Sequence, residues 1–323
     1  MVIRGEEGII LSVKPMVYML LFMLMGLAPV VWFRHLNEGA GAARTLPVVL
    51  VSQTERKMYR LNLEDYLVGV LAAEMPARFE LEALKAQAVA ARTVALGRMK
   101  RFGGRGSRYH QDADFSDDPN ESQAWLSPKQ LRTKWNYWEY GSFYRKIRRA
   151  VAETRGIVMV YNGKPIDAVF HSTCGVGTEA AVNVWKHDVP YLQRVPCGVD
   201  SHSPRYKQQL FFRWDDVARR LRISVAEART LKIAEMTQSG RVLRLACGSR
   251  YIDGQEFRKV FQLNSNAVRL EKTPAGLRME VTGYGHGVGM CQYGADGLAK
   301  RGWKYQQILA HYYQGIGFRK IKY

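Results

Sequence analysis

One glutamate in this chain has surroundings that suit it for acid–base chemistry. Glu74 follows the apolar run Val70-Leu-Ala-Ala and precedes Met75-Pro76. Removal from water and the negative end of a helix both disfavour the charged carboxylate, so the pKa of Glu74 should be raised. A carboxyl group that keeps its proton near neutral pH can donate it to a leaving group. The alternative is a structural carboxylate that caps a turn or pairs with Arg78 or Arg92.

Two short pairs of histidine and cysteine have the spacing of metal ligands. His171 and Cys174 have two residues between them, and Cys197 and His202 have four. Four nitrogen and sulfur ligands in two pairs suit tetrahedral Zn²⁺. The same residues are compatible with buried thiols, with a Cys174–Cys197 disulfide or with a catalytic cysteine–histidine pair. Cys247 lies outside both pairs, in a segment that alternates like a strand, which predicts a core cysteine.

Four glycines alternate with larger residues in Gly283-Tyr-Gly-His-Gly-Val-Gly-Met290. The segment is neither a phosphate-binding loop nor a dinucleotide fingerprint, because the required glycine and lysine spacings are absent from it. Alternating glycines permit close approach of two backbones. Tyr284 and His286 would then share one face of an extended segment and could line a substrate cleft. The alternative is a tightly packed turn with His286 hydrogen-bonded in the core.

Two helices separated by a break must position Glu74. Asn62 is a good N-cap and two acidic residues follow it, which the helix dipole favours. Apolar residues then recur at helical spacing until Pro76 ends the helix at or near Glu74. A second helix is expected over about 80–100, with a narrow face of small residues that favours close packing of another helix.

The rest of the chain mixes further helices and strands. A hairpin turned at Asn162-Gly163 is expected, and a basic helical segment after Trp214. Strands are predicted at 241–247, 259–263 and 277–281. Because no regular strand–helix–strand alternation is present, we expect an α+β fold in a single mixed unit over residues 47–323.

The N-terminus and the net charge bear on location. Residues 15–33 are uncharged and would span about 28 Å as a helix, which predicts a transmembrane anchor between a short tail (1–14) and a linker (34–46). A large domain after one span is most simply exported, so we expect a single-pass cell-membrane protein whose catalytic domain is extracytoplasmic. The small residues 39–43 leave open a cleaved signal peptide.

The chain has 323 residues and a formal net charge of +19, which implies an anionic partner or surface. An extracytoplasmic location argues against nucleic acid. It favours the membrane surface or an anionic polymer of the cell wall.

Several blocks together resemble the stage II sporulation protein D family, in the same order over residues 47–323. They are Tyr66-Leu-Val-Gly-Val-Leu-Ala-Ala-Glu-Met-Pro76, Ala83-Leu-Lys-Ala-Gln-Ala-Val-Ala-Ala-Arg-Thr93, Gln123-Ala-Trp125, Phe170-His-Ser-Thr-Cys-Gly175 and Gly283-Tyr-Gly-His-Gly-Val-Gly-Met-Cys-Gln-Tyr-Gly-Ala295. The resemblance implies a peptidoglycan lytic transglycosylase that acts on peptide-stripped glycan strands during forespore engulfment. It also implies a partner amidase, protein P of the same stage, and the membrane protein M.

The resemblance assigns residues as well. The family's catalytic glutamate falls on Glu74, and the block that binds zinc in some members falls on His171 and Cys174. The matching blocks supply six candidate substrate-binding residues: Arg92, Gln123, Tyr284, His286, Gln292 and Tyr293.

Three positions depart from the family pattern. The usual Cys/Ser-Gly-Gly-x-Thr reads Cys174-Gly-Val-Gly-Thr178 here, and the serine that follows Gly-Met is Cys291. Asp200 stands near Cys197 where members with a cysteine-rich block often have a second cysteine. For this reason His202 is our candidate for the fourth zinc ligand.

A single carboxylate fits the implied chemistry. Hydrolytic glycosidases usually need two carboxylates. A lytic transglycosylase can use one, because the 6-hydroxyl of muramic acid is a nucleophile already tethered to the substrate. Two alternatives remain: a non-catalytic wall-binding enhancer of a partner amidase, and a zinc hydrolase centred on His171 and Cys174.

Overall fold

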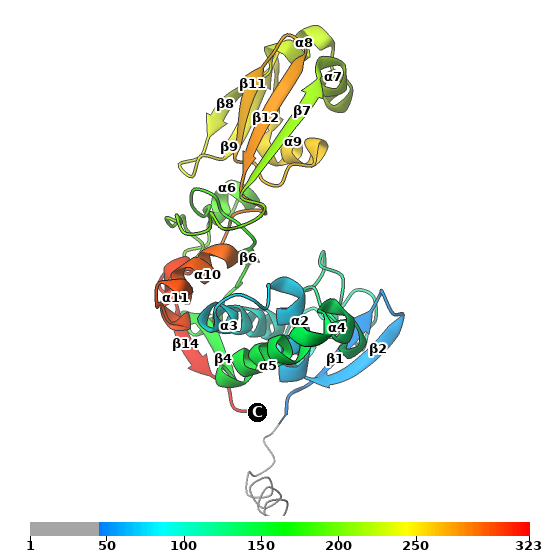
Figure 1. Cartoon of the computed structure of the whole chain (residues 1–323), viewed down its shortest axis with the longest axis vertical. Helices are drawn as coiled ribbons and strands as arrows, with labels where there is room; N and C mark the ends of the chain where they lie inside the picture. The colour runs from blue at the N-terminus through cyan, green and yellow to red at the C-terminus, as the bar shows by residue number, and fades with distance from the viewer. Residues whose placement is uncertain (1–44) are drawn as a thin grey trace, which may run out of the picture. The chain divides into compact units, whose positions relative to one another are not determined.

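Helices and strands alternate irregularly in the computed structural model, which describes residues 45–323 (Figure 1). The strands of this part form five small sheets, so the predicted α+β class is confirmed. Residues Leu46–Lys322 form one unit. The predicted tail, the anchor at 15–33 and most of the linker lie outside the described residues. Within residues 45–323, no helix combines the length and the hydropathy that crossing a bilayer requires.

The first sheet leads directly into the helix that carries Glu74. Strand β1 (Pro47–Ser52) pairs antiparallel with β2 (Lys57–Asn62) and parallel with the short β3 (Phe115–Ser116). Helix α2 (Leu63–Glu74) begins immediately after β2, and the Asn62 side chain accepts a hydrogen bond from the Asp65 N–H. The predicted N-cap is therefore confirmed, and the helix ends at Glu74, just before Met75-Pro76.

Helix α3 (Leu81–Arg98) lies at the centre of the helical layer and contacts α2, α5, α10 and α11. These neighbours are α5 (Tyr137–Glu153), α10 (Gln292–Lys300) and α11 (Tyr305–Tyr312), and α3 is followed by the short η1 (Lys100–Phe102). Helix α4 (Pro128–Lys134) contacts α2. All six alanines of α3 are fully buried. Small side chains let neighbouring helices approach closely, which is the packing that the sequence predicted.

A hairpin and a two-stranded ladder connect the middle of the chain to its end. The hairpin of β4 (Ile157–Tyr161) and β5 (Lys164–Pro165) turns at Asn162 and Gly163, whose φ angles are 49° and 78°. Two positive φ angles characterise the type I′ turn that Asn-Gly favours. The last strand, β14 (Gly317–Lys320), pairs with β4. Strand β6 (Phe170–His171) pairs in parallel with β13 (Met290–Cys291), so segments that are distant in the sequence meet at the site.

Two more sheets and three helices enclose a separate hydrophobic cluster. The sheets are β11-β12-β7, with β7 (Lys207–Arg213), β11 (Val268–Lys272) and β12 (Gly276–Thr282), and β10-β9-β8, with β8 (Lys232–Met236), β9 (Val242–Cys247) and β10 (Arg250–Asp253). The helices are α7 (Trp214–Leu221), α8 (Val225–Thr230) and α9 (Gly254–Phe261); the short α6 (Ala181–Trp185) precedes them. Cys247 is buried in β9, as predicted.

The predicted strand at 259–263 is wrong. Most of it belongs to α9, which Asp253 caps by accepting hydrogen bonds from two backbone N–H groups. Phe257 and Phe261 are four residues apart and both are buried, with ring centroids 4.6 Å apart. That spacing places both rings on one helical face.

Candidate active site and thiol cluster

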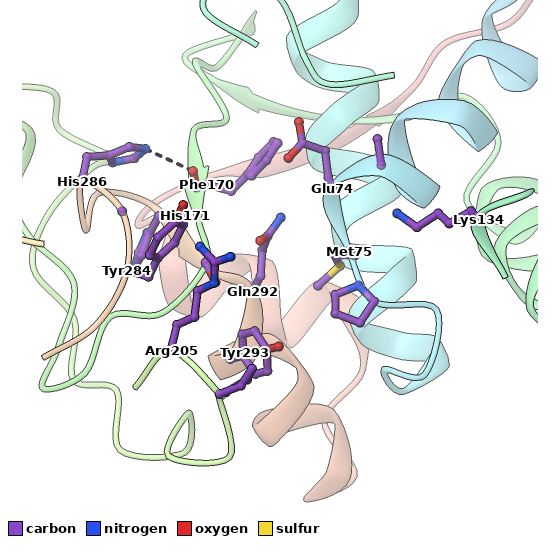
Figure 2. Close-up of a pocket in the computed structure, with 15 residues that line it drawn as sticks. Glu74, Met75, Lys134, Phe170, His171, Arg205, Tyr284, His286, Gln292 and Tyr293 are labelled. Carbon is purple, nitrogen blue, oxygen red and sulfur yellow. Dashed lines mark hydrogen bonds between the residues drawn. The ribbon is translucent and has the colours of Figure 1, made fainter. Parts of the chain in front are cut away.

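A pocket of about 670 Å³ opens at the C-terminal end of α2 (Figure 2). Its walls come from the ends of α2 and α4, from β6, from the loop before β7, from the glycine-rich segment and from the start of α10. Its volume lies in the range of ligand-binding pockets in proteins. Glu74, Met75, Lys134, Phe170, His171, Arg205, Tyr284, His286, Gln292 and Tyr293 are among the lining residues.

Glu74 is half-buried and is the only carboxylate among the residues that line this pocket. Its Oε1 accepts a hydrogen bond of 2.8 Å from the Ala124 N–H. Burial raises the pKa of Glu74, while the Ala124 hydrogen bond and the charge of Lys134 act in the opposite direction. The net direction is upward, as the sequence predicted, which is the direction that a general acid requires.

Close packing holds the Ala124 N–H in place. The Trp125 ring packs on Gly69 of α2, where an added Cβ would lie 2.2 Å from the Trp125 Nε1. The Gln123 side chain is buried and its Nε2 donates to the Ala91 carbonyl over 3.1 Å. Gln123 therefore does not line the pocket as a substrate-binding residue. It fixes the segment that hydrogen-bonds to Glu74.

The glycine-rich segment adopts backbone conformations that glycine favours. Its four glycines, Gly283, Gly285, Gly287 and Gly289, have φ angles of 82°, 115°, 87° and 69°. An added Cβ on Gly289 would lie 2.1 Å from the Val169 carbonyl oxygen. Only glycine permits this conformation and this approach without strain. Tyr284 and His286 line the pocket, as predicted from the alternation.

Both pocket histidines are held as neutral rings. His286 accepts from the Val288 N–H at Nδ1 (3.0 Å), so its Nε2 carries the proton and donates to the Phe170 carbonyl (3.1 Å), as the dashed line in Figure 2 marks. Burial lowers the pKa of His286 to about 4. Burial also lowers the pKa of His171 well below its usual value, and its Nδ1 lies 3.1 Å from the Val288 carbonyl.

Two further predicted residues lie in the pocket wall. Gln292 is buried, and its Nε2 lies 3.3 Å from the Gln87 Oε1. The Tyr293 ring packs edge-on against Phe79, with centroids 4.8 Å apart. Both side chains come from the first turn of α10, which follows β13 directly.

Arg92 is not at the pocket. Its guanidinium is fully buried and pairs with Glu64, with Nη2 2.6 Å from Oε2 and Nε 3.1 Å from Oε1. It also donates to the carbonyls of Val151 and Ile157. These contacts hold α2, α3 and α5 together, so the expected substrate-binding role of Arg92 is wrong.

Lys134 and Arg205 are two cationic residues in the pocket lining that were not predicted from the sequence. Lys134 is the last residue of α4, and partial removal from water lowers the pKa of its ammonium group. The Arg205 guanidinium lies over the Tyr284 ring, 4.5 Å from its centroid. Neither residue belongs to a recognisable motif, so only the fold reveals their position.

Beside the pocket, three cysteines and one aspartate form a buried cluster that could hold a metal ion. Cys174, Cys197, Asp200 and Cys291 each offer a ligand atom, and these four atoms lie within 4.8 Å of one another. The Cys174 Sγ lies 3.2 Å from the Asp200 Oδ2, and the Cys291 Sγ lies 3.6 Å from the same oxygen. All four cysteines of the chain are free thiols. The alternative of a Cys174–Cys197 disulfide is therefore wrong.

The donor set of this cluster, defined as Cys174, Cys197, Asp200 and Cys291, fits a divalent soft cation. Asp200 is fully buried, and its Oδ1 has no hydrogen-bond partner among the described residues. A buried carboxylate oxygen without a partner is unfavourable, and a bound cation would satisfy it. Three sulfur ligands and one oxygen ligand are within the usual tetrahedral chemistry of Zn²⁺. Buried Arg241, which donates to the Cys174 carbonyl, offsets part of the negative charge.

The two predicted histidine ligands lie elsewhere. His171 lines the pocket through β6, as described above. His202 lies 2.9 Å from Asp296, which also forms an ion pair with Lys300. Of the four predicted ligands the structure brings together only Cys174 and Cys197. The other two positions of the cluster are filled by Asp200 and Cys291, which are two of the departures from the family pattern.

The third departure, at Cys174-Gly-Val-Gly-Thr178, is also explained. Gly175 has a φ of 82° and donates its N–H to the Asp200 Oδ2 over 2.8 Å, so the residue that makes the turn is retained. Val176 follows it with 55% of its surface exposed. The side chain that stands in place of the second glycine is therefore largely exposed to solvent, while Gly175 keeps the positive φ of the turn.

Comparison with known proteins identifies the family of this chain. The family model described as "Stage II sporulation protein" matches residues 52–161. Stage II sporulation protein D of Bacillus amyloliquefaciens is 33% identical over 287 residues, which cover 87% of this chain and 82% of that protein. The protein of the same name from Bacillus subtilis is 33% identical over 282 residues, covering 86% and 81%. The amidase enhancer of Bacillus subtilis is 29% identical over 307 residues, covering 77% of this chain and 39% of that protein. The chain belongs to the stage II sporulation protein D family.

Proposed function

We propose that this member of a sporulation protein family is a lytic transglycosylase, with Glu74 as its acid and base. The observation that carries this proposal is the single carboxylate of the pocket. Water-using glycosidases usually place two carboxyl groups on either side of the bond that they cleave. A pocket with one raised-pKa carboxyl group suits a reaction whose nucleophile is part of the substrate.

In the reaction Glu74 first donates a proton to the substrate and later accepts a proton from it. Glu74 donates its proton to the glycosidic oxygen between muramic acid and glucosamine, and the bond from that oxygen to the anomeric carbon breaks. The 6-hydroxyl of the same muramic acid attacks the anomeric carbon, and its proton passes to the Glu74 carboxylate. The products are a 1,6-anhydro-muramic acid end and a glucosamine with a free 4-hydroxyl. No water is consumed, and Glu74 regains its starting state.

The surroundings of Glu74 support both halves of this cycle. Burial favours the protonated carboxyl group that starts the reaction, whereas the Ala124 N–H and the nearby Lys134 charge stabilise the carboxylate that follows proton donation. The two opposing influences keep both protonation states accessible. Tyr284, Tyr293 and Gln292 supply aromatic faces and an amide in the wall that a sugar strand would contact.

We propose zinc as the metal of the thiol cluster, with a structural role. Cys174, Cys197, Asp200 and Cys291 would all be ligands, which leaves no open position for a water molecule. The metal would fix the segment after β6 and the loop before β7, which carries Arg205. Chemistry at the glycosidic bond then remains with Glu74.

We further propose peptide-stripped glycan strands as the substrate, forespore engulfment as the setting, and an extracytoplasmic site of action with a membrane anchor at residues 15–33. The amidase that removes the peptides and the membrane protein M of the same stage are the proposed partners. The family assignment and the basic net charge of the chain support this setting.

Reaction in heavy-oxygen water tests the mechanism. The purified chain is incubated with peptide-free glycan strands, and the new ends are analysed by mass spectrometry. We expect anhydro ends without heavy oxygen, because no water enters the bond. Incorporation of heavy oxygen at the new end would identify a hydrolase instead. Absence of any product, together with stimulation of an amidase, would identify a wall-binding enhancer.

A further inference from the structure

The charges of the pocket do not balance. Lys134 and Arg205 are its two cations, and Glu74 is the only carboxylate among its lining residues. The two pocket histidines are neutral because burial lowers the pKa of each. The pocket therefore carries a net positive charge even when Glu74 is ionised. A partly enclosed pocket of one sign attracts a ligand of the opposite sign.

Arg205 is the cation that is free to bind an anion. Its guanidinium is held over the Tyr284 ring at 4.5 Å from the centroid, and Figure 2 shows it pointing into the pocket toward Gln292. No aspartate or glutamate of the described residues lies within ion-pair distance of it. The guanidinium is a planar group whose N–H donors form a rigid fork, and the contact with the Tyr284 ring helps to hold that fork in place. Such a fork binds a carboxylate through two parallel hydrogen bonds.

Lys134 stands in a different position. It is close enough to Glu74 for its charge to lower the pKa of that carboxyl group, and Glu74 in turn raises the pKa of Lys134. Its charge is thus coupled to the catalytic group. Arg205 comes from the loop before β7 and lies across the pocket from α2 (Figure 2).

The substrate of the proposed reaction carries an anion at a suitable position. Muramic acid bears a lactyl group on O3, and C3 is two bonds from the anomeric carbon at which Glu74 would act. In a strand with its stem peptides, the lactyl carbonyl is part of a neutral amide. After the peptide is removed, the same group is a free carboxylate. A residue that distinguishes the two states must lie in the pocket but away from the acid, as Arg205 does.

Resting on the proposed function, we propose that Arg205, oriented by Tyr284, binds the free lactyl carboxylate of muramic acid and thereby selects strands without stem peptides. The site then recognises a carboxylate that an earlier reaction creates, namely hydrolysis of the amide bond between the lactyl group and the peptide. Cleavage of the strand would follow removal of the peptides because the pocket recognises the charge that this removal creates.

Binding to two matched probes tests this inference without a need for cleavage. The probes are muramic-acid-containing tetrasaccharides that differ only in the lactyl group, which is a free carboxylate in one and its methylamide in the other. The protein carries Glu74→Gln, so that neither probe is consumed, and affinities are measured by calorimetry. We expect the carboxylate probe to bind about 10–100-fold more tightly, the range for a hydrogen-bonded pair of charges.

Adding Arg205→Gln should reduce this preference to less than about threefold, mainly by weakening the carboxylate probe. Arg205→Lys keeps the charge without the fork, so it should retain an intermediate preference. Arg301→Gln is the control, because Arg301 is exposed and does not line the pocket. Thermal melting verifies that each variant is folded.

The outcomes separate the two proposals. A preference that persists in Arg205→Gln would overturn the role of Arg205 and leave the proposed function standing. Equal binding of the two probes by the Glu74→Gln protein would do the same. If neither probe binds, the result counts against the proposed function and, with it, against the inference.

Discussion

At the scale of the residue, Glu74 has a perturbed pKa whose causes are identifiable. Burial raises it, and the Ala124 N–H and Lys134 partly offset that effect. A residue held this way destabilises the folded protein when it is charged, which is frequent at sites selected for activity rather than stability.

The difference in stability between wild type and Glu74→Gln should depend on pH. The folded pKa of Glu74 is raised above that of the unfolded chain, so the folded state holds the proton more tightly, and stability falls as pH rises through the folded pKa. Glutamine stays neutral and can still accept the Ala124 hydrogen bond. We therefore expect Glu74→Gln to melt at a higher temperature than wild type at neutral pH, with no difference below the ordinary pKa of glutamate. Calorimetric melts at both pH values measure this; a lower melting temperature at neutral pH would contradict it.

Lys134 should set the pH range of activity. Its charge lowers the pKa of Glu74, so Lys134→Gln should raise that pKa further. The alkaline limb of the kcat profile reports loss of the general acid's proton and should move to higher pH. Lys129→Gln, on the exposed side of the same helix, is the control and should leave the limb in place. An unmoved limb in Lys134→Gln would show that the ammonium group does not act on Glu74.

At the scale of the element, α2 positions the carboxyl group of Glu74, and the segment after β3 donates the Ala124 hydrogen bond that lowers its pKa. The tight fit of Trp125 on Gly69 predicts that Gly69→Ala displaces this segment, since its Cβ would lie 2.2 Å from the indole nitrogen. We expect a loss of about 1–3 kcal/mol of stability and at least about tenfold lower kcat. Gly97→Ala on α3 is the matched control: nothing lies within 4 Å of its added Cβ. It should stabilise the protein by about 0.5–1 kcal/mol. Full activity in Gly69→Ala would show that Ala124 does not need to be held.

The thiol cluster makes a prediction about metal content. We expect the purified protein to hold about one zinc ion per chain. Cys291→Ser and Asp200→Asn should each weaken zinc binding at least about tenfold and lower the melting temperature. Cys247→Ser, in β9 and outside the cluster, should keep the full zinc content. Elemental analysis after dialysis measures the content; unchanged zinc in Cys291→Ser would remove that residue from the ligand set.

At the scale of the whole molecule, features that depend on neighbouring residues were predicted better than features that depend on segments far apart in the sequence. The cap at Asn62, the stop at Pro76 and the turn at Asn162 were predicted correctly, because each depends on a few neighbouring residues. The alternation of glycines likewise identified Tyr284 and His286 as pocket residues. These features are fixed by backbone preferences that the sequence states directly.

Features that depend on several distant segments were missed or misassigned. Arg205 and Glu74 line the same pocket only because the loop before β7 and the end of α2 come together in the fold, and nothing in the sequence near Arg205 indicates this. The substrate-binding role of Arg92 was predicted because Arg92 lies in a block that matches the family. Its hydrogen bonds with Glu64 and with two backbone carbonyls instead satisfy it in the core. For the cluster a signal was present: Asp200 and Cys291 both depart from the family pattern, and the fold brings them together.

The central claim is that one carboxylate performs the cleavage. The most direct test is mass spectrometry of the products released from peptide-free glycan by wild type, Glu74→Gln and the control Glu80→Gln, which alters an exposed carboxylate outside the pocket. We predict anhydro-muramic ends from wild type and Glu80→Gln, and a loss of at least about a thousandfold in Glu74→Gln, whose structure should be unchanged. Release of the same ends at the wild-type rate by Glu74→Gln would contradict the account.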